Sequence, residues 1–155
     1  MAYFAQLDDT NTVIAINKIS NNDCLDGDGN ESEEVGIAFC QTLWGDDTNW
    51  KQTSFNTRGG VRYLPSDDNS SPEEDTREGK AQFRRNCAEV GGTWDEGRDS
   101  FILKKPYPSW IVNEDFGWYE PPIAYPGITN YQQTNVWDEK YLYHWDEAIV
   151  NWVLS

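Results

Sequence analysis

The chain has 155 residues, enough to bury about 68–70% of its unfolded surface, so a hydrophobic core can form without a metal or a disulfide. Aromatic residues make up 14% of it and tryptophan occurs 8 times, which favours large rings packed on β-sheets. The net charge of −15 repels nucleic-acid phosphates and anionic lipid surfaces, so we expect neither nucleic acid nor a membrane as a partner.

The N-terminal segment, residues 2–18, predicts a β-hairpin. Tyr3, Ala5 and Leu7 share one face of the first strand, residues 8–11 form a polar turn, and apolar residues resume after it. The segment lacks the basic region and the long apolar stretch of a signal peptide, and no run of about 20 apolar residues follows. We therefore expect synthesis in a cytoplasm.

The next segment, residues 20–31, is a polar loop whose acidic spacing is similar to the start of a calcium-binding EF-hand loop. The match fails because Glu31 stands where that loop needs glycine and Ile37 stands where it needs a bidentate glutamate. The loop is interpreted as a solvated turn, and we expect no metal or other cofactor.

One α-helix is predicted at about residues 32–44. Ser32 is a typical N-cap, two glutamates follow in the first turn, and a glycine comes directly after the last helical residue. Val35, Phe39 and Leu43 recur at helical spacing and form a narrow apolar stripe. A stripe on one side predicts that the helix packs on a sheet.

The three cysteines, Cys24, Cys40 and Cys87, match no metal-binding spacing. An odd number of cysteines in a cytoplasmic chain indicates reduced, structural thiols. The alternative is a disulfide between Cys24 and Cys40, which would close a loop worth about 3 kcal/mol of stability in the entropic model.

Residues 50–55 alternate as a strand and residues 58–61 form a turn. The chain then divides into an N-terminal part, residues 1–64, an acidic flexible insertion or arm, residues 65–82, and a tryptophan-rich part, residues 83–155. We expect the first and last parts to form one compact domain.

The tryptophan-rich part repeats a short pattern in which an aromatic residue, an acidic turn and a second aromatic residue follow one another. The spacing predicts β-hairpins with a turn of four to six residues and aromatic rings that face each other across the strands. Proline-rich connectors interrupt the series at residues 106–108 and 121–127. The predicted pairs are Trp94 with Phe101, Trp110 with Trp118, Trp137 with Trp145, and Trp145 with Trp152. The whole is a mainly β protein, in which antiparallel hairpins form a small sandwich or a meander with the helix packed on a sheet.

The sequence contains no recognisable set of catalytic residues. His144 is the only histidine, and its place beside Trp145 in a strand predicts an exposed side chain. The acidic pair Asp95 and Glu96 has the composition of a glycosidase couple, but adjacent strand residues point to opposite faces and the pair fits a turn better. We expect the protein not to be an enzyme.

Several phrases together resemble small structural proteins of tailed marine bacteriophages, notably phages of cyanobacteria. They are residues 1–8, residues 24–44, residues 50–61, residues 107–110 and the closing Trp-Asp-Glu hairpins. The resemblance covers nearly the whole chain. It implies a virion component without catalysis, made in the host cytoplasm and incorporated in many copies, and it carries over no functional residue.

Three functions are open on this basis. The first is a capsid decoration or cement protein that binds the major capsid protein and associates with its own copies on the virion. The second is a tail, baseplate or fibre component. The third is a carbohydrate-binding module in which exposed rings stack on sugars. The candidate binding residues, for a protein or a glycan, are Trp110, Trp118, Tyr119, Pro121, Pro122 and Tyr125.

Overall fold

The computed structural model describes residues 1–64, 73–76, 83–126 and 143–154. These residues belong to two compact units. The first unit contains Met1–Lys104 and Val112–Trp118, and the second unit contains Lys105–Ile111 and Tyr119–Ser155. The predicted division into residues 1–64, 65–82 and 83–155 stays a prediction.

The first unit is built around a three-stranded antiparallel sheet of order β2-β1-β3. Its strands are β1 (Ala2–Leu7), β2 (Val13–Ile19) and β3 (Asn49–Thr53). A turn closed by the Asp8 carboxylate joins β1 to β2, since that carboxylate accepts hydrogen bonds from two backbone N–H groups further along the turn. The predicted N-terminal hairpin is confirmed. The strand predicted at residues 50–55 is confirmed as β3, which ends two residues earlier, at Thr53.

Both faces of the central strand are buried. Ala5 and Leu7 pack with Trp94 and Phe101 on one face. On the other face Phe4 is fully buried in a cluster that also contains Cys40. The alternation of apolar residues in the sequence predicted burial of the first face only. Burial of the second face could not be predicted in this way, because it depends on the helix that covers it.

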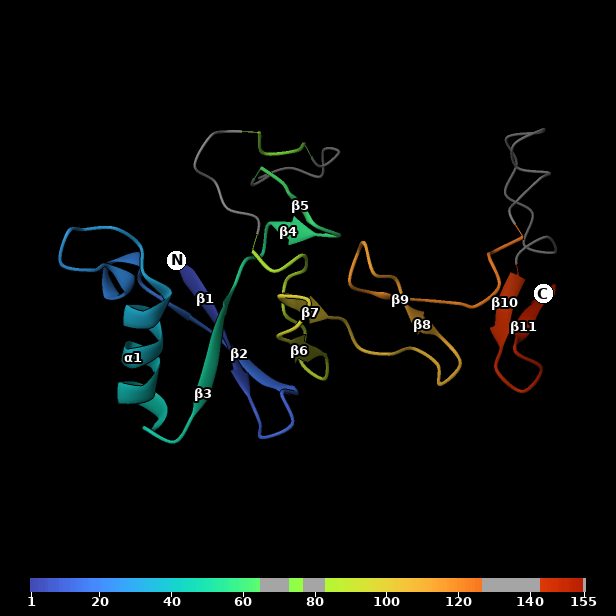
Figure 1. Ribbon diagram of the computed structural model, residues 1–155, viewed down its shortest axis with the longest axis horizontal. Helices are drawn as coiled ribbons and strands as arrows, with labels where there is room; N and C mark the ends of the chain where they lie inside the picture. The colour runs from blue at the N-terminus through green and yellow to red at the C-terminus, as the bar shows by residue number, and fades with distance from the viewer. Residues whose placement is uncertain (65–72, 77–82, 127–142, 155) are drawn as a thin grey trace. The chain divides into compact units, whose positions relative to one another are not determined.

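The helix α1 (Glu33–Trp44) supplies the cover for this second face (Figure 1). Its predicted cap is confirmed, since Ser32 accepts a hydrogen bond from the backbone of Val35. The predicted apolar stripe is confirmed only in part: Phe39 packs against this cluster, but Leu43 is 54% exposed and the buried helical residues are Gly36 and Cys40. The helix turns this face inward because the ring of Phe4 fits against its backbone: a Cβ atom at position 36 would lie 2.2 Å from Phe4 Cζ.

A short 3-10 helix, η1 (Asn21–Cys24), precedes the polar loop. In that loop the Asp26 carboxylate accepts hydrogen bonds from the backbone N–H groups of Asp28 and Asn30. The loop is thus closed by the side chain of Asp26, as in an Asx turn.

A tight hairpin follows β3. It consists of β4 (Thr57–Arg58) and β5 (Val61–Arg62), which are joined by Gly59 at φ 59° and Gly60 at φ 80°. Two successive residues with positive φ are typical of a type I′ turn, and the turn predicted here is confirmed. Of the acidic insertion, the structure describes residues 73–76, and the rest of it lies outside the described residues.

Three further hairpins have one design. The strands are β6 (Thr93–Asp95) with β7 (Ser100–Ile102), β8 (Ile111–Val112) with β9 (Tyr119–Glu120), and β10 (Tyr143–Asp146) with β11 (Asn151–Leu154). Trp94 lies directly opposite Phe101, and Trp145 lies directly opposite Trp152. These two predicted pairs are confirmed. Trp137 lies outside the described residues.

The prediction of a mainly β chain of antiparallel hairpins with one helix is confirmed. No described helix is long and apolar enough to cross a membrane.

Candidate interaction site

An ion pair closes the outer edge of β3 in the first unit. Arg84 donates to both carboxylate oxygens of Glu33, at 2.7 and 2.6 Å, and to the carbonyl of Gln52 at 2.5 Å. Glu33 in turn accepts the N–H of Gln52 at 2.8 Å. The two side chains therefore satisfy the backbone groups that a further strand would use, which protects this edge from strand addition.

The same arginine covers the buried ring of Trp94, at 5.0 Å from the ring centroid. Burial opposes the charged form of Glu33, but the hydrogen bonds from Arg84 and from the Gln52 N–H outweigh it and hold the pKa of Glu33 below its ordinary value. The pair thus supports the core in its charged form.

Asn86 joins three segments of the first unit. Its amide nitrogen donates to the carbonyls of Phe101, Phe116 and Gly117, at 3.1, 2.8 and 3.1 Å, and its amide oxygen accepts the N–H of Gly59 at 2.9 Å. The side chain is almost completely buried. This role of Asn86 could not be recognised in the sequence, since its hydrogen-bond partners lie 15 to 31 residues away.

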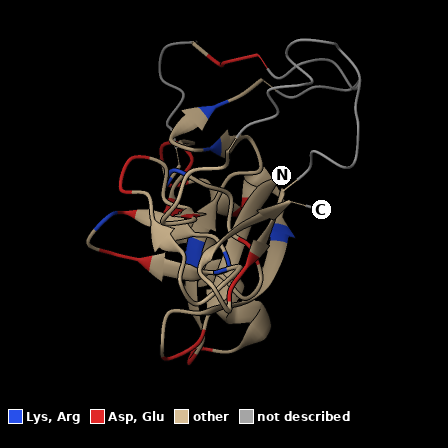
Figure 2. Cartoon of the chain, turned by 90° about the vertical axis from the view of Figure 1, so that its right-hand side faces the viewer, with Lys and Arg blue, Asp and Glu red and all other residues tan. Residues whose placement is uncertain are grey.

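The three later hairpins repeat a turn that begins with Asp or Asn and has a positive φ four residues later. The first residue accepts a backbone N–H within the turn in every case. The residues with positive φ are Asp99, Gly117 and Val150. Glutamate always follows the first turn residue, at Glu96, Glu114 and Glu147. Acidic residues therefore concentrate in the turns, as Figure 2 shows.

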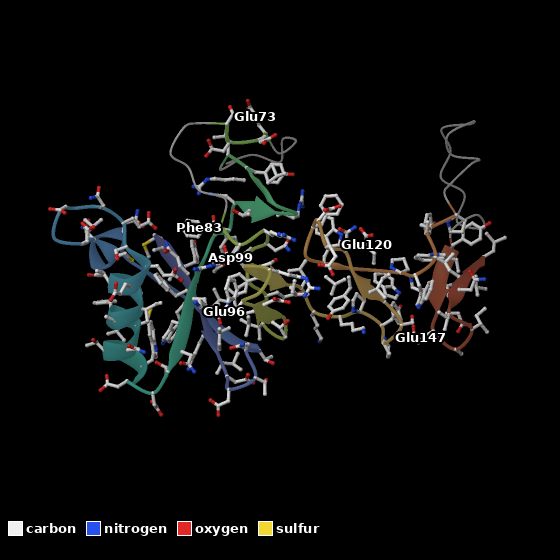
Figure 3. All side chains as sticks on the ribbon, in the orientation of Figure 1. Glu73, Phe83, Glu96, Asp99, Glu120 and Glu147 are labelled. Atoms are coloured by element: carbon white, nitrogen blue, oxygen red, sulfur yellow. The ribbon has the colours of Figure 1, made fainter. Side chains whose placement is uncertain are left out.

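Two of these glutamates fasten neighbouring segments. Glu114 makes an ion pair with Arg98 of the preceding hairpin at 2.7 Å. Glu147, at the turn between β10 and β11 (Figure 3), accepts the N–H and the hydroxyl of Ser109, at 2.8 and 2.6 Å, and the indole N–H of Trp145 at 2.8 Å. The hydrogen bonds from Ser109 and then Trp145 lower the pKa of Glu147. The proline-rich connector that contains Ser109 is thereby tied to the last hairpin.

Aromatic rings of the second unit form a continuous series. Successive centroids are 4.8–6.1 Å apart and most of the contacts are edge-to-face, a favourable arrangement of ring quadrupoles. The series runs through Tyr107, Trp110, Trp145, Trp152, Tyr125 and Tyr143.

Many of the described apolar side chains of the second unit nevertheless face solvent. Among its described residues, Trp145 is the one large apolar side chain that is buried. Ile149 and Ile111 are 61% and 59% exposed. Other exposed apolar side chains of this unit are Tyr107, Ile123, Tyr125, Val150 and Leu154. This set, from Tyr107 to Leu154, is called the apolar surface of the second unit.

The structure divides the predicted binding residues between the units. Trp110, Tyr119, Pro121, Pro122 and Tyr125 belong to the second unit. Tyr125 and Pro122 are exposed, whereas Trp110, Tyr119 and Pro121 are half-buried. Lys105 lies over the ring of Tyr119, 5.2 Å from its centroid.

Trp118 belongs to the first unit and is also half-buried. It stacks on Phe116 at 4.8 Å, and it lies so close to the turn of the β4–β5 hairpin that a Cβ atom on Gly59 would approach its ring to 2.9 Å. The ring is thus a packing element of the first unit.

Cys24 and Cys40 are buried in the same core cluster and both carry free thiols. Burial, and then the neighbouring Cys24, raise the pKa of Cys40 to about 11. The side chain of His144 is exposed, as expected for its strand position. Within the described part of the chain, no group of three His, Cys, Asp or Glu side chains is placed to hold a metal ion.

An exposed ring just beyond the end of β3, that of Phe55, was not predicted from the sequence. Phe55 is 66% exposed and contacts Tyr3 at 4.7 Å between ring centroids. The only signal in the sequence was an aromatic residue directly before a polar loop, which predicted strand packing rather than exposure.

No family model, no curated protein and no solved structure matches the chain in the three comparisons.

Proposed function

We propose that the chain is a non-enzymatic structural protein of a phage virion, and specifically a decoration or cement protein of the capsid. One observation carries the proposal: seven large apolar side chains among the described residues of the second unit are exposed, including Ile111 and Ile149. Exposed apolar side chains grouped in one unit are what a protein that binds another protein would present.

The short hairpins and the charge support this role. The β10–β11 hairpin of the second unit is a two-stranded sheet with an acidic turn, and the edges of such a sheet can pair with strands of a neighbour. A net charge of −15 keeps free copies soluble before they reach a surface. On a symmetric lattice, many weak contacts add up to tight attachment.

The first experiment measures where the protein is in purified particles. Quantitative mass spectrometry of separated heads and tails is expected to find it in heads, at a fixed ratio to the major capsid protein. Its presence in the tail fraction alone would contradict the capsid assignment and would favour the second alternative, a tail, baseplate or fibre component.

The second experiment tests the surface. Ile111→Asp and Ile123→Asp introduce a charge into the apolar surface of the second unit and are expected to reduce occupancy on particles lacking the wild-type protein by at least about tenfold. Leu43→Asp is the matched control, because Leu43 is similarly exposed but lies on α1 of the first unit. Equal occupancy of all variants would contradict a role for the second unit in attachment.

A carbohydrate-binding module is the alternative that the ring series supports. Tyr107 and Tyr125 expose 37% and 40% of their surface at two positions of that series, and such rings can stack on the apolar face of a sugar. A glycan array and tryptophan fluorescence with host polysaccharide would test it. No hit on the array together with an unchanged spectrum would remove this alternative.

A further inference from the structure

The end of β3 carries an apolar surface with hollows on either side of one ring. Phe55, which is 66% exposed, separates a hollow of about 440 Å³ from one of about 210 Å³. The larger hollow is lined by Tyr3, Ile16, Asn17, Lys18 and Phe55, and the smaller one by Phe55, Asn56, Arg58 and Tyr63. These residues are called the Phe55 surface.

The charge of this surface is opposite to that of the chain. Lys18 and Arg58 are its charged side chains, while the chain as a whole carries −15. Within the described part of the chain neither of them makes an ion pair, although Arg58 lies over the Tyr63 ring at 5.6 Å. Such a surface favours an occupant that is both apolar and acidic.

The turn between β10 and β11 has both of these properties. Ile149 and Val150 are 61% and 40% exposed, and Ala148 separates them from the carboxylates of Asp146 and Glu147 in the same turn. Because Glu147 and Asp146 hold the turn by hydrogen bonds, its apolar tip is fixed before it meets a partner, which lowers the entropic cost of binding.

We propose that the β10–β11 turn of one copy binds the Phe55 surface of a second copy, with Ile149 against Phe55 and the turn carboxylates facing Lys18 and Arg58. The two surfaces differ, so the contact is heterologous and each copy can bind one neighbour on each side. Repetition then gives a row or a ring of copies. The inference rests on the proposed coat function for its role, since a row of copies would link neighbouring positions on a capsid.

Sedimentation velocity of the full chain tests the contact without any particle. The wild type is expected to associate in the upper part of a micromolar-to-millimolar series, because its net charge opposes close approach. Phe55→Ala and Ile149→Ser are each expected to weaken association by at least about tenfold. Leu43→Ser, another exposed apolar position on α1, is expected to behave as the wild type.

Mixing the two defective variants is the decisive step. The Phe55→Ala chain keeps an intact turn and the Ile149→Ser chain keeps an intact Phe55 surface, so the mixture is expected to form a one-to-one complex and nothing larger. Circular dichroism confirms that each variant is folded. A mixture that stays monomeric, or a wild type that stays monomeric throughout, would overturn the inference while leaving the particle experiments unaffected.

Discussion

At the scale of single residues, the first unit depends on buried polar side chains that join segments distant in sequence. Asn86 shows this most directly, because its one amide group holds the β4–β5 turn, β7 and residues 116–117 together. Replacing it leaves several buried backbone groups without a partner. An unpaired buried group costs about 1–3 kcal/mol, far more than the hydrogen bond contributes when it is made.

Asn86→Ala is therefore expected to lower the free energy of unfolding by about 3 kcal/mol, measured by urea denaturation. Asn22→Ala is the matched control, because Asn22 is exposed at the start of the polar loop. The control is expected to stay within about 0.5 kcal/mol of the wild type. Equal effects of the two changes would show that Asn86 does not hold the three segments.

The Glu33–Arg84 pair predicts a pH dependence. Because the folded-state pKa of Glu33 lies below its ordinary value of 4.5, the stabilisation from the pair is fully present above that value and is lost as the pH falls through the folded-state pKa. The stability difference between the wild type and Glu33→Gln should be large at pH 7 and shrink below pH 4.5. Urea titrations at a series of pH values measure it. A difference that stayed constant with pH would contradict this account.

At the scale of elements, the structure explains which features the sequence could predict. Caps and turns depend on a few adjacent residues, so the Ser32 cap and the Gly59–Gly60 turn were predicted correctly. The buried face of α1 was predicted only in part, because periodicity counts large apolar side chains, whereas this face includes Gly36, which has no side chain. The ring of Phe4 occupies the space instead.

The repeated hairpin turn carries strain at one position. Val150 has φ 52°, a conformation that the other two hairpins give to Asp99 and Gly117, and a β-branched residue there is a conformational outlier. Val150→Gly is expected to stabilise the hairpin by about 1 kcal/mol, because glycine adopts this conformation without a steric penalty. Thermal unfolding followed by near-ultraviolet circular dichroism measures the change.

Val153→Gly is the matched control for that change, because Val153 lies in β11 opposite His144. There glycine is expected to destabilise by about 0.5–1 kcal/mol. If both substitutions lowered the midpoint alike, the left-handed conformation of Val150 would not be a source of strain.

At the scale of the whole molecule, the class of fold could be predicted from the sequence, whereas the exposure of individual aromatic rings could be predicted only in part. The spacing of the aromatic residues predicted the β6–β7 and β10–β11 hairpins, and Tyr125, one of the candidate binding residues, is 40% exposed. Exposure of Phe55 could not be predicted, because it depends on how β1, β2 and the β4–β5 hairpin surround the end of β3. The sequence likewise could not show that Trp118 packs inside the first unit.

The last prediction concerns the net charge of the whole chain. Repulsion among 27 acidic residues destabilises the folded state, and salt screens it, since the Debye length falls from about 30 Å at 0.01 M to about 10 Å at 0.1 M. The midpoint of urea unfolding is therefore expected to rise with sodium chloride over this range. The Glu33–Arg84 pair is partly buried and is screened less than the surface charges.

Replacing the exposed acids Asp9, Asp28 and Asp46 by asparagine removes three charges. The change should raise the midpoint of urea unfolding at low salt and make that midpoint less dependent on salt. A midpoint that falls with added salt would instead show that local ion pairs outweigh the long-range repulsion.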